Sequence, residues 1–472
     1  MRILFATSEA VPYWKTGGLA DVARSLPDAL VRAGHDVLIV HPYYRVLRED
    51  PPPADVVGIE TLPWPGGDLP VRYLLHRPED RAPALFVDQP YFFDVLDPYG
   101  PTRFDRVAAG RRFAIFCRAV AERARAWEAD VVHLNDWPTG LVPVYSRIDG
   151  WRVPTVFAIH NLGYQGNFPP SLLPEIGVPW SFFAVDRGVE FYGTASFLKG
   201  GISLSDRLVT VSPTYAEEIQ TSEFGMGFDG LLRHRSTDLV GILNGIDPDT
   251  WNPARDRALA LRFDPDTVQR KDRNREALLH ELGLEGGGPL FVMIARLVQQ
   301  KGIDLVLEAL PELVRRGARL AVLGSGDPRY EEELSHAVTD HPRRVAAIIR
   351  FDDGLARRLY AGGDFFLMPS HYEPCGLGQL LDPEAVVLVR SFDRHAVSPC
   401  IGAGLADRRP RRYRGGRCHG FLIRPRDAGR PPRSRRAGVR EVEGAGVEFV
   451  ARTVHAPRLV VATVGRALRT AV

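Results

Sequence analysis

The chain has 472 residues, of which 45% are hydrophobic and 25% are charged, and its formal net charge is +2. This length predicts two or three domains, and the composition is typical of a globular protein. The sequence contains neither an apolar run of about 18 residues nor a separate charged and apolar leader, so we expect no membrane span and no secretory signal. The four cysteines are scattered without a C-x-x-C pair, which argues against a zinc knuckle and a disulfide scaffold. A cytoplasmic enzyme is therefore the expectation.

The first predicted elements are a buried strand over 2–7 and a helix over 19–33, joined by the run Lys-Thr-Gly-Gly-Leu-Ala-Asp at 15–21. Glycines let the backbone approach a ligand closely, and the N–H groups and dipole at a helix N-terminus favour an anion. Lys15 adds a full positive charge. This segment is predicted to bind a phosphate group.

Lysine is rare in this chain, which uses arginine for almost all of its positive charge; the lysines are Lys15, Lys199, Lys271 and Lys301. Such a background is expected to spare a lysine where a compact ammonium fits and a planar guanidinium does not. Lys15 and Lys301 lie beside glycines between a strand and a helix, which favours a functional role. Lys271 is expected on a solvated surface, and the pattern leaves Lys199 open between the two.

Further apolar strands are predicted at 37–40, 131–134 and 155–159, and continuous apolar strands separated by helices indicate a parallel sheet covered on both faces. Ligands bind beyond the carboxyl ends of such strands. Asp136 and His160 each follow a strand and are candidate site residues.

Trp137 follows Asp136, and its ring either stacks on a sugar or packs in the core. A second sheet is predicted from strands at 290–295, 320–323 and 364–368, with an amphipathic helix over 303–315. We therefore expect an α/β fold with two Rossmann-like, doubly wound domains facing a cleft. The expected division is 1–250 for the first domain, 251–272 for a linker, 273–380 for the second domain and 381–472 for an atypical tail.

Arg296 and Lys301 flank one loop between a strand and a helix, and two cations there suit a diphosphate. Glu373 begins a Glu-Pro-Cys-Gly-Leu run after another strand, where its carboxylate either holds sugar hydroxyls or belongs to an ordinary turn. Cys375 has no nearby histidine and is expected to be a small buried residue. Two Asp-Pro-Asp runs, at 247–249 and 264–266, are predicted to be turns, so no metal site is expected.

The sequence resembles bacterial glycogen synthases and plant starch synthases, which are retaining glucosyltransferases of the two-Rossmann (GT-B) type. Besides the runs at 15–22 and 373–377, the resemblance is carried by Asn-Asp-Trp at 135–137 and Ile-His-Asn-Leu at 159–162, and it continues in family order to about residue 380. Further matching runs are Tyr-Gln-Gly at 164–166, Glu-Phe-Tyr-Gly at 190–193, Ser-Phe-Leu-Lys at 196–199, Thr-Val-Ser-Pro-Thr-Tyr at 210–215, Leu-Asn-Gly-Ile-Asp at 243–247, and Arg-Leu with Gln-Lys-Gly at 296–302.

The resemblance implies glucose transfer from a sugar nucleotide, usually ADP-glucose and alternatively UDP-glucose, to the nonreducing end of an α-1,4-glucan, with retention of configuration. It implies no cofactor. The catalytic residues that it implies are His160, Glu373, Arg296 and Lys301. The substrate-binding residues that it implies are Lys15, Gly18, Asp21, Asp136, Asn244, Cys375, Gly376 and Leu377. Nucleic acid and membranes are not expected partners, and the sequence leaves the oligomeric state open.

The family pattern stops after Gln379, and residues 381–472 carry a net charge of about +11. Residues 408–440 have too little apolar content to predict a core. One explanation is a basic tail that binds acidic partners, and the other, which we favour, is a reading-frame shift near codon 380. Two competing functions therefore remain open: a remnant that binds glucan or nucleotide without turnover, and a phosphorylase, which would need a pyridoxal phosphate lysine in the second domain.

Overall fold

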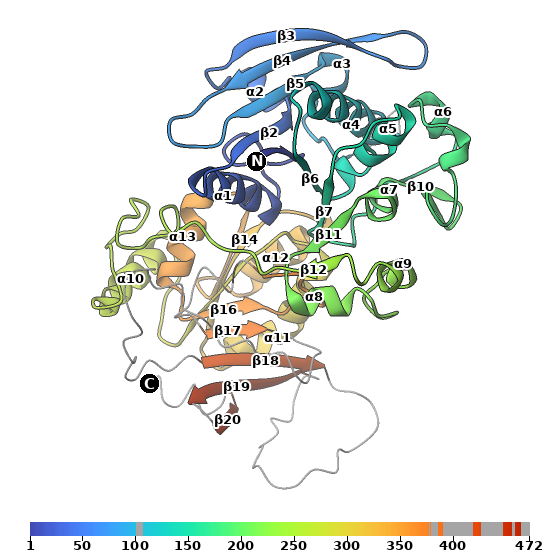
Figure 1. Cartoon of the computed structure of the whole chain (residues 1–472). Coiled ribbons are helices and arrows are strands. Elements are labelled where there is room, and N and C mark those ends of the chain that lie inside the picture. Colours follow the sequence, from blue (N-terminus) through green and yellow to red (C-terminus); the bar gives the residue numbers. More distant parts are fainter. Residues whose placement is uncertain are drawn as a thin grey trace. The chain divides into compact units, whose positions relative to one another are not determined.

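The computed structural model describes residues 1–100, 107–376 and 378, and the strands at 386–389, 419–425, 447–455 and 458–463. The chain divides into two units, Met1–Gly245 and Ile246–Val472, which are coloured blue to green and yellow to red in Figure 1. Each unit is built around its own mainly parallel sheet. No helix among these residues is long and apolar enough to cross a bilayer.

The sheet of unit 1 is parallel from β12 to β5 and ends in two antiparallel strands, β4 and β3. Across the sheet the order is β12 (Leu239–Gly241), β11 (Arg207–Thr210), β7 (Thr155–Ile159), β6 (Val131–Asn135), β1 (Arg2–Ala6), β2 (Asp36–Pro42), β5 (Ala84–Asp88), β4 (Leu69–His76) and β3 (Asp55–Leu62). The central strand β1 is paired in register with β2 on one side and with β6 on the other. Their carboxyl ends therefore lie at one edge of the sheet.

Helices and a small second sheet complete unit 1 (Figure 1). The helices are α1 (Gly18–Arg32), α2 (Arg45–Glu49), α3 (Pro90–Phe93), α4 (Ala108–Ala126), α5 (Val142–Ile148), α6 (Leu172–Glu175), α7 (Phe197–Leu204), α8 (Pro213–Glu218) and α9 (Asp229–His234), with 3-10 turns η1 (Trp137–Thr139) and η2 (Trp180–Phe182). The small sheet has the order β8 (Asn167–Phe168), β10 (Thr194–Ser196) and β9 (Glu190–Phe191). Ala23 of α1 packs in one buried cluster with Phe5, Ile39 and Phe86, so this helix covers one face of the main sheet.

The sheet of unit 2 is parallel from β15 to β18 and antiparallel from β18 to β20. Its order is β15 (Val345–Ile349), β14 (Arg319–Gly324), β13 (Leu290–Ile294), β16 (Phe365–Met368), β17 (Val386–Val389), β18 (His419–Pro425), β19 (Val447–His455) and β20 (Arg458–Thr463). The helices of this unit are α10 (Lys271–Glu281), α11 (Ile303–Arg315), α12 (Pro328–Asp340) and α13 (Asp353–Gly362), with 3-10 turns η3 (Val268–Arg270) and η4 (Gln299–Lys301).

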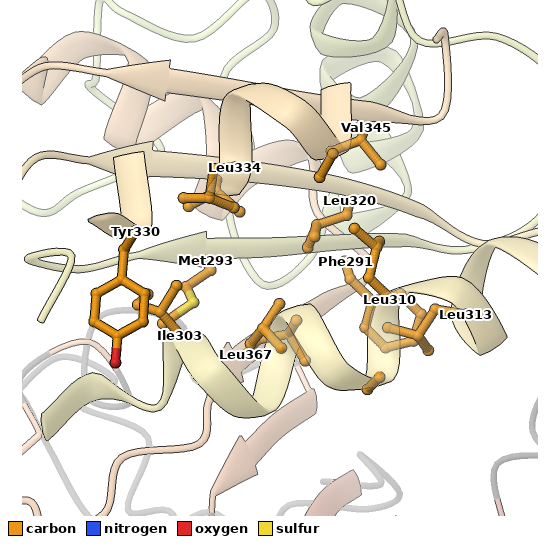
Figure 2. Close-up of a cluster of buried hydrophobic side chains, with 14 of the residues drawn as sticks. Phe291, Met293, Ile303, Leu310, Leu313, Leu320, Tyr330, Leu334, Val345 and Leu367 are labelled. Atoms are coloured by element: carbon orange, nitrogen blue, oxygen red, sulfur yellow. The ribbon is translucent and has the colours of Figure 1, made fainter. Parts of the chain in front are cut away.

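Alternate residues of β13 point into two different cores. Phe291 and Met293 pack with residues of α11 and α12, as Figure 2 shows for Leu310 and Leu334. The neighbouring residues of the same strand, Leu290 and Val292, belong to a second cluster with residues of α10 and α13. The sheet is therefore covered by helices on both faces, as the continuous apolar strands predicted.

Four strand segments after residue 381 pair with the sheet of unit 2 through their backbones. One of them, β18, lies within residues 408–440, where the sequence predicted too little apolar content for a core. The strands themselves contain many apolar and β-branched residues, as in the Val-Val-Leu-Val run of β17, although the sequence did not lead us to predict them.

The segment predicted as a linker, 251–272, belongs to unit 2. Arg357 of α13 donates to the carboxylate of Asp256 in this segment at 3.1 Å and to the carbonyl of Thr250, the residue just before it, at 2.6 Å. The same guanidinium lies 4.8 Å from the centre of the Trp251 ring.

Candidate active site

The Lys15 loop (residues 7–17) follows the carboxyl end of β1 and leads into α1. The side chains of Lys15 and Asp21 form an ion pair of 2.8 Å, and they are 21% and 31% exposed. Gly17 is the residue before the first turn of α1, and Gly18 opens the helix. The cation and the helix N-terminus predicted from the sequence therefore lie in the same short segment, and Asp21 is one partner of the cation.

The carboxylate of Glu9 organises this loop from within. Its Oε2 accepts hydrogen bonds from the backbone N–H of Thr16 at 2.7 Å and of Gly17 at 3.2 Å. Its Oε1 accepts from the hydroxyls of Thr16 at 2.6 Å and Tyr99 at 2.8 Å. Two amides that the glycine-rich sequence suggested for a phosphate are thus bonded to a buried carboxylate.

Asp136 lies one residue beyond β6 and is 8% exposed. Its backbone has a φ of 56°, in the left-handed region that non-glycine residues seldom occupy and that typically costs about 1–3 kcal/mol. Its Oδ1 accepts hydrogen bonds from the backbone N–H groups of His160 at 2.8 Å and Asn161 at 3.4 Å. Burial raises the pKa of Asp136 to about 7, and the nearby charge of Glu9 adds to this, while the two N–H donors act in the opposite direction.

His160 lies directly beyond β7, next to Asp136, and its imidazole is held by Asn135. The amide nitrogen of Asn135 donates to the carbonyl of Ala6 at 2.8 Å, so its Oδ1 is the atom that accepts from Nε2 of His160 at 3.0 Å. His160 is therefore the tautomer with hydrogen on Nε2, and its Nδ1 is an acceptor. Burial lowers the pKa of His160 to about 3, and nearby His133 adds to the shift.

The ring of Trp137 packs inside unit 1. Trp137 is 8% exposed and contacts the rings of Phe113, Phe168 and Phe197, with centroid separations of 4.9, 5.9 and 6.3 Å. Of the two roles that the sequence left open for this tryptophan, the structure therefore supports packing. Asn244, another predicted binding residue, lies three positions beyond β12 in the segment that ends unit 1.

In unit 2 the structure joins Lys301 and Glu373, which are 72 residues apart. Nζ of Lys301 lies 2.6 Å from Oε2 of Glu373, and the two side chains are 19% and 18% exposed. Ser370 donates its hydroxyl to the same carboxylate oxygen at 2.9 Å. Lys301 follows β13 and Glu373 follows β16, and these strands are parallel neighbours in the sheet.

The two loops that carry this pair touch through their backbones. The N–H of His371 donates to the carbonyl of Gln300 at 2.8 Å. Gly302 has a φ of 71°, and a Cβ at this position would lie 2.1 Å from the carbonyl oxygen of Pro369. Only glycine fits here, and its absence of a side chain lets the loops approach.

The remaining predicted residues of unit 2 lie on the same two loops. Arg296 lies two residues beyond β13 and is half-buried, and the adjacent Leu297 is fixed by a backbone bond to the carbonyl of Ser325 at 3.0 Å. Cys375 is 9% exposed, and Gly376 adopts a φ of 74°. Leu377 lies outside the described residues.

The two other lysines have partners that the sequence did not indicate. Lys199 is 5% exposed, and its ammonium donates to the carbonyl oxygens of Val185, at 2.6 Å, and Glu190. Burial lowers the pKa of Lys199. Lys271 was expected on a solvated surface, but it is half-buried, and its ammonium lies 5.7 Å from the centre of the Phe263 ring.

Sequence analysis missed Glu9, Tyr99 and Ser370, which hold the predicted residues in place. Glu9 carried one weak signal, a carboxylate in the loop directly after the first strand. Tyr99 carried none, because its partner Glu9 is 90 residues away, whereas Ser370 lies three residues before Glu373, a local spacing that could have been noticed.

Comparisons with known proteins match both units to glycosyltransferases. Residues 2–234 match the starch synthase catalytic domain family, and residues 288–381 match the glycosyl transferases group 1 family. The chain is 45% identical over 391 residues to glycogen synthase of Anaeromyxobacter dehalogenans, which covers 80% of this chain and 81% of that protein. It is also 45% identical over 393 residues to glycogen synthase of Cellvibrio japonicus, covering 80% of each chain.

Solved structures give the same answer for the fold. The catalytic domain of starch synthase IV from Arabidopsis thaliana, in a structure bound to ADP and acarbose, is similar with a TM-score of 0.74 and 30% identity, covering 84% of this chain and 86% of that one. Sucrose-phosphate synthase from Thermosynechococcus elongatus shares the fold, with a TM-score of 0.51 and 15% identity over 83% and 81% of the two chains. The expected α/β fold of the GT-B type is confirmed. The chain belongs to the glycogen and starch synthase family of glycosyltransferases.

Proposed function

We propose that this chain transfers glucose from ADP-glucose to the nonreducing end of an α-1,4-glucan with retention of configuration. One observation carries the proposal: in each unit a lysine about one-fifth exposed is held by a carboxylate beyond the carboxyl ends of parallel strands. Loops at this end of an open α/β sheet are where phosphate-bearing ligands bind. Adenine as the base is supported by the ADP of the similar starch synthase.

Lys15, Arg296 and Lys301 are the proposed ligands of the diphosphate. The departing diphosphate gains negative charge as the bond to the anomeric carbon breaks, and fixed cations stabilise that charge most effectively in a partly buried site. Gly18 and Asp21 support this role, Gly18 as the first residue of α1 and Asp21 as the partner of Lys15.

Asp136, His160, Asn244 and Glu373 are proposed to orient the glucosyl group, with Cys375, Gly376 and Leu377 lining the same site. A neutral His160 whose Nδ1 accepts hydrogen bonds suits a sugar hydroxyl as its partner. The charge of Glu373 suits the positive character that the glucosyl group develops in an oxocarbenium-like transition state.

The test is to incubate the purified chain with glycogen and either ADP-glucose or UDP-glucose. We expect glucose incorporation into glycogen together with equimolar release of ADP, and much less incorporation from UDP-glucose. Equal or greater incorporation from UDP-glucose would reject the choice of adenine, and no incorporation from either donor would reject the proposed activity of this chain.

The end of the second family match at residue 381 favours one alternative, a remnant that binds ligands without turnover. Calorimetric titration with ADP, combined with the release assay, identifies such a remnant, because it binds ADP but releases none from ADP-glucose. A phosphorylase would differ from both, since its activity would depend on inorganic phosphate and its spectrum would contain the pyridoxal phosphate band.

A further inference from the structure

Glu9 is a buried carboxylate with four hydrogen-bond donors, and it lies outside the set of residues proposed above to touch substrate. It is 4% exposed. Its donors come from two segments about 90 positions apart, the Lys15 loop and the residues around Tyr99. Hydrogen bonds to an ionised group are stronger than those between neutral groups, so this carboxylate fixes both segments firmly.

Three of the hydrogen bonds that Glu9 accepts come from Thr16 and Gly17, the two residues between Lys15 and Gly18. Thr16 donates both its backbone N–H and its hydroxyl, and Gly17 donates its backbone N–H. Anchoring these residues sets the direction in which the Lys15 side chain leaves the loop and the point at which α1 begins. The first amides of α1, which have no acceptors within the helix, are directed by the same anchor.

Tyr99 ties this anchor to the body of unit 1. Its hydroxyl lies 2.8 Å from Oε1 of Glu9 and 2.8 Å from the hydroxyl of Ser8. Burial and the adjacent charge of Glu9 raise the pKa of Tyr99 well above its usual value, so the phenol keeps its proton and remains a donor. Its ring stacks on Phe113 of α4, with centroids 5.6 Å apart.

Glu9 is also close enough to Asp136 for its charge to act on that carboxyl group. The Lys15 loop beyond β1 and the Asp136–His160 pair beyond β6 and β7 are therefore neighbours around one buried carboxylate.

We infer that Glu9 is a positioning residue that holds Lys15 and the start of α1 in the conformation that binds the diphosphate. The inference rests on the proposed function, in which Lys15 binds that group. It makes a separate structural claim as well, that Glu9 keeps the Thr16 and Gly17 amides ordered whether or not a nucleotide is bound.

Two variants of Glu9 test the inference in the full-length chain. Glu9→Ala removes the acceptor, and we expect ADP to bind about 10–100-fold more weakly in calorimetric titration. Glu9→Gln retains an amide oxygen that can accept from Thr16 and Gly17, so we expect ADP affinity within a few-fold of the parent. Hydrogen exchange followed by mass spectrometry, without ligand, should show faster exchange at residues 15–18 in Glu9→Ala and near-parent exchange in Glu9→Gln.

Asp206→Ala is the matched control. Asp206 also accepts from the backbone N–H and the hydroxyl of one threonine, Thr155, both at 2.8 Å, but it does so at the amino end of β7, the opposite edge of the sheet. We expect this variant to bind ADP like the parent, with faster exchange confined to the region of Thr155.

The possible results separate the two claims. Parent-like exchange at residues 15–18 in Glu9→Ala, or parent-like ADP affinity in that variant, overturns the role of Glu9. A parent chain that binds no ADP overturns the nucleotide site of the proposed function, and the exchange experiment then still decides whether Glu9 anchors the loop. Equal loss of ADP affinity in Asp206→Ala would show a general effect of instability and would also overturn the inference.

Discussion

Lys15 and Lys301 are each held by a carboxylate that limits the ammonium group to one position. The two ion pairs measure 2.8 and 2.6 Å, and all four side chains are at least two-thirds buried. A flexible lysine loses side-chain entropy when it binds a ligand, and an existing partner has already removed much of that freedom. An ammonium is a compact point charge whereas a guanidinium is a planar fork, and this difference fits the presence of lysine at these two positions in an arginine-rich chain.

Replacing Lys301 with alanine is expected to lower turnover by roughly 10²–10³-fold, because the charge that we propose to stabilise the departing diphosphate is lost. The measurement is the initial rate of glucose incorporation at saturating glycogen, with thermal unfolding as a check on the fold. Arg315→Ala is the control, since the Arg315 side chain lies on the following helix, is 70% exposed and pairs locally with Glu312. If Lys301→Ala turned over at the rate of the parent, the proposed role of Lys301 in the active site would be rejected.

Asp136 makes the stability of unit 1 depend on pH in a predictable direction. Its pKa is about 7 in the folded chain against an ordinary 3.8, so between these values the folded chain holds a proton that the unfolded chain has released. The stabilisation that the folded chain gains from the tightly held proton of Asp136 is therefore fully present below about pH 4. It is lost as the pH rises through about 7. Asparagine at this position cannot ionise.

Asp136→Asn should therefore gain stability relative to the parent as the pH rises from 4 to 7, by about 2–4 kcal/mol in total. Urea unfolding followed by tryptophan fluorescence measures this difference, because six of the seven tryptophans lie in unit 1. A difference that stays constant across this pH range would show that Asp136 titrates normally.

At the scale of elements, the site depends on how closely two loops of unit 2 approach each other. The loop after β13 and the loop after β16 meet at Gly302, where the carbonyl of Pro369 occupies the space of a side chain. The Lys301–Glu373 pair spans the same two loops. The close contact between Gly302 and Pro369 and the Lys301–Glu373 ion pair therefore require the same approach of the two loops.

Gly302→Ala is expected to destabilise unit 2 by about 2–4 kcal/mol, because it combines an unfavourable φ with a steric clash. Gly317→Ala is the matched control: Gly317 has a φ of 83°, but nothing lies within 4 Å of a Cβ placed there. Its cost should be limited to the backbone strain, about 1 kcal/mol. Urea unfolding followed by circular dichroism gives the free energy of unfolding of both variants. An equal decrease in the two variants would show that the Pro369 carbonyl moves aside for the new methyl group at no energetic cost.

At the scale of the whole molecule, unit 1 has its own sheet and its own buried cluster. Met1–Gly245 also has the length of an ordinary domain. We therefore predict that residues 1–245 expressed alone fold and unfold cooperatively, with a fluorescence transition close to that of the full chain. A fragment without a cooperative transition would show that unit 1 depends on the rest of the chain.

The tail is the other feature of the whole molecule. The family resemblance stops after Gln379, and the second family match ends at residue 381. Reading the gene in its other frames distinguishes the two explanations for this break. A synthase-like continuation in another frame supports a frame shift, and the lack of one in both frames supports a basic tail.

Much of the fold was predictable from local sequence. The helix expected over 303–315 is α11 with the same bounds, and the strand expected over 155–159 is β7. Both signals are strong because burial imposes a regular period on the apolar residues of each element. The candidate site residues were also visible from sequence, because they follow strands at the edge where an α/β sheet binds ligands.

Sequence alone therefore determined many of the central strands and helices, the family of the chain and which side chains follow the strand ends. The tertiary structure decided the partners: Glu373 for Lys301, Glu9 for the Lys15 loop, and a packed environment for Trp137. These contacts join residues that the chain separates by up to 72 positions. Partners at such distances leave no periodic signal, since they meet only after strands and helices have packed.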